Sequence, residues 1–177
     1  MTLLGRVLPA ALILVLWLAA APGLARAAGS TPFAVLPLVV GDTGLPDAIR
    51  PSVAERTALA DQLAREAERA RPVRAVADGR VARALAAAGF DQDAPYRACN
   101  AAACARRIGR ALGVRAVVFG SVTRYMALIW GMDVSVVDVR TGRVTGPFSL
   151  GYKGDYAALY AGEDDLSVAL ARTLSAR

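Results

Sequence analysis

Apolar and polar positions alternate through much of the stretch 114–150, and this pattern predicts the central β-structure of the chain. Over 126–137 the even positions are apolar while the odd positions are mixed, which is typical of a strand that turns one face towards a core. Thr141 and Gly142 form a tight-turn signal, and alternation resumes over 144–150. The sequence therefore predicts an antiparallel hairpin across this turn.

Helical periodicity of apolar residues dominates much of the remaining chain. Ser52 and Glu55 match a capping box, in which each side chain binds a free backbone N–H at the start of a helix. Arg56 and Asp61 are expected on the water-facing side of this helix, and Pro72 stops it. Further helices are predicted over 79–88 with Asp78 as the cap, over 101–112 with Asn100 as the cap, and from Asp164 towards the C-terminus.

Two short apolar runs complete the predicted sheet. The first, 33–40, contains Pro37, which donates no hydrogen bond and so places the strand at an edge or bulges it. The second covers 73–76. The order of elements predicts an α+β fold, a mixed-sheet α/β layer structure whose central sheet has a C-terminal antiparallel meander with helices packed on it.

The two faces of the long strand are predicted to have different roles. Helices are expected on the face that carries Trp130. The other face carries Ile129, Asp133, Ser135 and Val137, a mixed set that is free to meet water or another molecule. We predict that these four residues form an interaction face.

The N-terminus has the pattern of an export signal. Arg6 supplies a positive charge, 10–21 is an unbroken apolar run, and Ala25-Arg26-Ala27 is a small-x-small cleavage pattern. We therefore predict a signal peptide over 1–27 and a single mature α/β domain over 28–177. This organisation predicts a protein of the periplasm.

An uncleaved membrane anchor is the alternative, because 7–24 approaches the length of a bilayer span. Pro9, Pro22 and Gly23 disrupt a helix there and favour cleavage. No cysteine lies near the predicted cleavage site, which argues against a lipid anchor. We expect no stable membrane anchor after cleavage.

Charge and composition narrow the possible functions. The chain carries a net charge of +6, and removal of Arg6 and Arg26 leaves 19 basic against 15 acidic groups. The basic residues are spread out, so no nucleic-acid partner is predicted. Histidine is absent, which removes the commonest general base and transition-metal ligand, and no phosphate-binding glycine loop is present. We predict no catalytic residues, no cofactor and no metal.

Cys99 and Cys104 are the only cysteines, and the predicted export makes a disulfide the first interpretation. With Asn100 as the helix cap they occupy the two positions that meet in a hydrophobic staple, so a bond would fix the entry of the helix. A redox-active pair would more usually have two intervening residues rather than four. A metal site lacks further ligands.

Several motifs resemble those of a family of small exported bacterial proteins of unknown function. They are Cys99-Asn100, Cys104-Ala105, the run 111–122, Leu128-Ile129 and 138–142. The strand with Gly120-Ser121-Val122 also resembles the N-terminal α/β domain of TolB, and CsgG and related envelope proteins. The resemblance implies an envelope location and a non-catalytic, interaction-type fold.

These observations predict a non-catalytic periplasmic accessory or binding protein that contacts another cell-envelope protein. The alternative is a small-ligand carrier or enzyme with a site at the sheet edge near Ser121 and Asp133. Ser121 is not in a nucleophile elbow, and the chain offers it no histidine as a base. The alternative would therefore have to rely on Asp, Arg or Tyr side chains.

Overall fold

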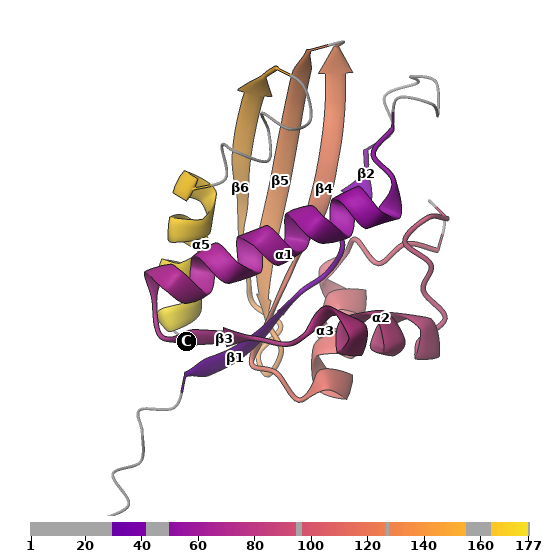
Figure 1. Ribbon diagram of the computed structural model, residues 1–177. Helices are drawn as coiled ribbons and strands as arrows, with labels where there is room; N and C mark the ends of the chain where they lie inside the picture. Colours follow the sequence, from indigo (N-terminus) through magenta and orange to yellow (C-terminus); the bar gives the residue numbers. More distant parts are fainter. Residues whose placement is uncertain (1–29, 42–49, 95–96, 127, 155–163, 177) are drawn as a thin grey trace, which may run out of the picture.

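A six-stranded mixed sheet runs through the molecule, with helices on both of its faces (Figure 1). The computed structural model describes residues 30–41, 50–94, 97–126, 128–154 and 164–176. The predicted signal peptide over 1–27 lies outside these ranges. Among the described residues, no helix has the length and apolar character that a bilayer crossing requires.

The strands follow the order β3-β1-β4-β5-β6, and β2 extends the line of β1 along β4. Pairing is parallel among β3, β1 and β4, whereas β4, β5 and β6 form an antiparallel meander, so the predicted fold class is confirmed. The strands are β1 (Thr31–Val35), β2 (Val39–Val40), β3 (Val73–Ala75), β4 (Ala116–Met126), β5 (Ile129–Asp138) and β6 (Val144–Lys153). The helices are α1 (Val53–Ala70), α2 (Asp78–Ala87), α3 (Ala102–Leu112) and α5 (Asp164–Ser175).

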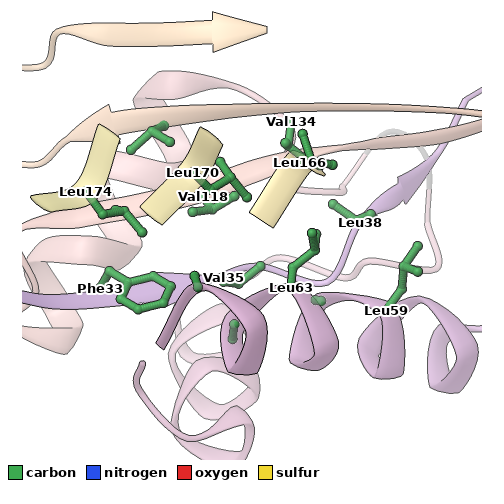
Figure 2. Packing of buried hydrophobic residues seen from close by; sticks show 14 of the residues in the cluster. Phe33, Val35, Leu38, Leu59, Leu63, Val118, Val134, Leu166, Leu170 and Leu174 are labelled. Carbon is green, nitrogen blue, oxygen red and sulfur yellow. The ribbon is translucent and has the colours of Figure 1, made fainter. Parts of the chain in front are cut away.

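Two separate cores hold the helices to the sheet. Leucines of α1 and α5 meet Phe33, Val118 and Val134 on one face, and Figure 2 shows them pointing into the same layer. Apolar residues of α2 and α3 pack on Val117 and Val137 on the other face. The expectation of helices on the Trp130 face was therefore incomplete, because a second helical layer covers part of the opposite face.

The helix starts agree only in part with their predicted caps. At α1 the capping box is present: Ser52 N–H donates to Glu55 Oε2 at 2.7 Å, and Glu55 N–H donates to Ser52 Oγ at 3.2 Å. At α2 the cap is Ala77, so Asp78 is the first helical residue. At α3 the cap is Ala101, not the predicted Asn100.

The predicted disulfide is confirmed, with Cys99 and Cys104 joined across 5.7 Å between their Cα atoms. Cys99 is 1% exposed and belongs to the core beneath α2 and α3, whereas Cys104 lies in the first turns of α3. The bond therefore fixes the start of α3 to the loop that precedes it. For a loop this small, the chain-entropy contribution to stability is about 2 kcal/mol.

Pro37 introduces a bulge between β1 and β2. Val35 pairs with Val118 and Val39 pairs with Ser121, so four steps along this segment match three along β4. The predicted bulge is confirmed, but β1 is an interior strand between β3 and β4 rather than an edge. The bulge turns the Pro37 and Leu38 carbonyls towards side chains: Gln92 Nε2 donates to Pro37 O and Arg56 Nη1 donates to Leu38 O, both at 2.7 Å.

Arg56 is buried, contrary to the expectation that it faces water, because its carbonyl partners surround it. Besides Leu38 O, it donates from Nη1 to Gln92 O at 3.1 Å and from Nε to Pro51 O at 3.3 Å. Its Nη2 pairs with Asp93 Oδ1 at 3.0 Å, but the Asp93 side chain is 70% exposed and this ion pair contributes little. The carbonyl contacts therefore account for most of its stabilising effect.

Replacing Arg56 with leucine should lower the free energy of unfolding by about 3 kcal/mol, because buried carbonyls lose their donor. Urea denaturation measures the loss. The matched control is Arg65→Leu, at an exposed position of the same helix, which should shift stability by about 0.5 kcal/mol or less. Equal effects of the two substitutions would contradict this account, and Arg56→Lys, which keeps one donor group, should fall between them.

Candidate functional site

Large apolar side chains are exposed together where β4 turns into β5. Tyr125, Met126, Leu128 and Ile129 are 59%, 64%, 56% and 38% exposed, and Met126 pairs with Ile129 across the two strands. We call these four residues the hairpin end. Figure 1 shows this end of the meander extending beyond the helices. A contiguous exposed apolar patch is typical of a site that contacts another molecule.

The residues behind the hairpin end fix its shape. The Arg124 guanidinium lies over the Trp130 ring at 5.2 Å from its centroid, and Arg124 Nε donates to Met126 O at 3.2 Å. Tyr125 lies on Gly131, where an added Cβ would come within 2.6 Å of the tyrosine ring. The strand register also shifts between Arg124 and Met126, a bulge that re-aims the terminal side chains.

The predicted interaction face divides into an open part and a covered part. Ile129 belongs to the hairpin end, and Asp133 and Ser135 are half-buried further along β5. Val137 lies on the same side of β5 but is fully buried in the core beneath α2 and α3, so it is not part of an open interaction face. Alternation identified the side of the strand but could not show where the second helical layer begins to cover it.

Ser121 and Asp133, the predicted alternative site, are direct neighbours on β4 and β5. Ser149 of β6 completes the row, and its hydroxyl donates to Asp133 Oδ1 at 2.5 Å. Within the described ranges, no group of three or more His, Cys, Asp and Glu side chains could hold a metal ion. The row is a strip of small polar side chains beside the hairpin end, and Asp133 and Ser149 are hydrogen-bonded within it.

Ser121 also lines a cavity of about 680 Å³ between β2, the start of α1 and the segment before α3. Asp133 does not reach this cavity. Its walls mix polar and apolar groups, and its buried cation, Arg56, already donates to backbone carbonyls. The cavity therefore does not bring the two residues of the predicted alternative site into one pocket, since only Ser121 lines it.

A second cavity, of about 500 Å³, lies between α1 and α2. The pairing of β3 with β1 ends at Phe33, and the last bond between the two segments runs from Val76 N–H to Phe33 O at 2.9 Å. Beyond this bond β3 no longer covers β1, and the cavity lies there. Val35 and Pro37, which lie beyond the pairing with β3, line it. Its other apolar walls are side chains of α1, α2 and the segment after α2: Val53, Ala60, Val81, Ala82, Leu85, Ala86 and Phe90.

Two carboxyl groups meet in the α1–α2 cavity, where Asp61 is hydrogen-bonded to Asp78. Burial, together with this hydrogen bond and the neighbouring negative charge of Asp78, raises the pKa of Asp61 from 3.8 to about 7, and Arg65 opposes the rise. Sequence reasoning missed this pair, because Asp61 was expected to face water and Asp78 to cap α2. No spacing rule connects two aspartates on separate helices.

One family model accounts for most of the chain. The DUF3280 model, described as a protein of unknown function (DUF2380), matches residues 31–161. The chain belongs to this family. The resemblance to a family of unknown function is thereby confirmed, and membership assigns no activity to the protein. No curated protein matches the chain in sequence.

Solved structures share the fold at low identity. Lipoprotein GNA1162 from Neisseria meningitidis is 16% identical with a TM-score of 0.52, covering 83% of this chain and 97% of that one. The LpoB C-terminal domain from Salmonella enterica is 13% identical with a TM-score of 0.50, covering 71% and 84%. TolB from Acinetobacter baumannii is 12% identical with a TM-score of only 0.46, covering 83% of this chain and 29% of that one. The likenesses to GNA1162 and LpoB show a common fold.

Asp61→Asn should make the protein more stable at neutral and alkaline pH but not at pH 4. The folded state holds a proton on Asp61 up to about pH 7, whereas the unfolded chain releases it near 3.8, so the wild type loses stability as the pH rises between these values. Asparagine cannot ionise and avoids this loss. Because the group is only partly buried, the gain at pH 8 should be about 0.5–1 kcal/mol.

Urea denaturation at pH 4 and pH 8 measures the difference. Asp165→Asn, at an exposed position of α5, provides the control and should show no gain in stability at pH 8. A pH-independent effect of Asp61→Asn would contradict the assigned titration.

Proposed function

We propose that this protein is a non-catalytic binding protein of the bacterial cell envelope, which contacts another envelope protein through the hairpin end. The observation that carries the proposal is the exposure of four adjacent apolar side chains on a rigid support. Folding alone gives no reason to leave this cluster in water, since burying each side chain would stabilise the protein. A partner that covers the cluster would remove the unfavourable free energy of its exposure to water.

The composition of the hairpin end favours a protein partner. Tyrosine, methionine and arginine are enriched at protein interfaces, and here Tyr125, Met126 and Arg124 lie together. The stacked Arg124 and the bulge after it reduce the conformational freedom that binding would otherwise have to remove. Half-buried polar residues on the same side of the sheet, Asp133 and Ser135, supply a hydrophilic border.

An envelope location is supported by two independent features. The N-terminal sequence has the charge, apolar run and cleavage pattern of an export signal. The Cys99–Cys104 disulfide suits an oxidising compartment. The name of the structural neighbour GNA1162 describes a lipoprotein, which agrees with this location.

A photoreactive phenylalanine analogue at Leu128 should cross-link to one defined envelope protein when the protein is expressed in its native cells. The same analogue at Val144 is the matched control, because Val144 is also an exposed apolar residue, 43% exposed, but begins β6 at the other end of the meander. The Leu128 adduct should be absent from the Val144 sample. Equal adducts at both positions, or adducts with lipid alone, would overturn the proposal.

Leu128→Ser should weaken binding to the cross-linked partner at least tenfold, because burying a leucine side chain contributes about 1.5–3 kcal/mol. Its stability should change by about 0.5 kcal/mol or less, because the side chain is already exposed. Val144→Ser should leave the affinity unchanged. Surface plasmon resonance with the purified partner measures both, and a Leu128→Ser affinity equal to that of Val144→Ser would contradict the assigned contact surface.

A further inference from the structure

The α1–α2 cavity has mainly apolar walls and several carboxylate side chains. At about 500 Å³ it has the size of a small-molecule site, and side chains such as Val81, Leu85 and Phe90 form its walls. Asp61 and Asp78 enter it from different helices and hydrogen-bond to each other. An apolar pocket with a few convergent polar groups is the usual form of a ligand site.

The charges around this cavity favour a cation. Asp61, Asp78 and Asp91 line it, and Arg97 is the one basic residue among its described lining residues. Arg65 of α1 also acts on Asp61. The cavity wall is thus acidic in a chain whose overall charge is +6, so its acidity does not simply follow from the composition.

We propose that the α1–α2 cavity binds a small organic cation, an amine carried on an apolar body. The ammonium group would lie between the Asp61 and Asp78 carboxylates and replace the proton that they share. The apolar body would contact Val81, Leu85 and Phe90 in place of water. An anionic ligand meets the carboxyl pair unfavourably, and a neutral ligand leaves the repulsion between two ionised carboxylates uncompensated.

Binding of the cation should be linked to proton release. The pKa of Asp61, raised to about 7 in the empty cavity, falls when a positive charge lies beside it. Below pH 7 the amine must displace the proton that Asp61 holds, whereas at pH 8 the Asp61 carboxyl group is already largely ionised. Affinity should therefore rise between pH 5.5 and pH 8.

Isothermal titration calorimetry of the purified chain tests the proposal with three probes of similar shape: 2-phenylethylamine, 2-phenylethanol and 3-phenylpropanoate. The amine should bind at least tenfold more tightly than the alcohol at pH 8, and the carboxylate should not bind measurably. The amine affinity should fall at least threefold at pH 5.5. Equal affinities for amine and alcohol, or no amine binding at millimolar concentration, would overturn the proposal.

Two kinds of variant separate the charge from the cavity. Asp61→Asn and Asp78→Asn should each remove the preference for the amine, while Asp165→Asn on α5 should retain it. Ala82→Leu, at an exposed helical position that lines the cavity, should weaken both the amine and the alcohol. Unchanged amine binding in Asp61→Asn and Ala82→Leu would place the ligand elsewhere. Leu128→Ser should leave amine binding intact, so this test does not depend on the hairpin end.

Discussion

The bulge at Pro37 and the arginine that satisfies it are the constraint on which the rest of the fold depends. Proline cannot donate to a ladder, so the chain gains one residue relative to β4 and two carbonyls turn out of the sheet. A buried carbonyl without a donor costs about 1–3 kcal/mol, which is large against a total stability of about 5–15 kcal/mol. Arg56 and Gln92 supply those donors.

This solution connects segments that are distant in sequence. Arg56 links the start of α1 to the bulge by its hydrogen bond to Leu38 O. Gln92 links the segment after α2 to the bulge by its hydrogen bond to Pro37 O. Gln92 Oε1 also accepts from Cys99 N–H at 2.7 Å, which carries the connection to the disulfide and the start of α3. The helices are thereby fixed at the end of β1 that β3 does not reach, and the α1–α2 cavity remains between them.

Periodicity predicted the elements well because it depends on neighbours along the chain. The alternation around Trp130, the Ser52 capping box and the disulfide positions all agree with the structure. The prediction that Val137 is open to a partner was wrong, because helices from elsewhere in the sequence cover this residue. The Asp61–Asp78 pair failed for the same reason, since it depends on how two helices approach each other.

The prediction that Arg56 faces water failed for a different reason, because the sequence did contain evidence of its burial. It precedes Leu59 by three residues and Leu63 by seven, the spacing of the buried stripe on α1. Its charge suggested exposure, yet its position required burial. A charged residue on an apolar stripe indicates a set of backbone acceptors elsewhere in the chain. Pro37 indicated where they lie, because the bulge around it exposes the Leu38 carbonyl to which Arg56 donates.

The position of the hairpin end follows from the same strand arrangement. Pairing of β2 with β4 ends at Val122, so beyond that residue β4 is paired only with β5 among the described strands. Among the described strands, no parallel strand lies beside β4 there, and α1 and α2 connect to strands of the parallel part of the sheet. The long strands β4 and β5 therefore extend past the helical layers, and their apolar ends are exposed.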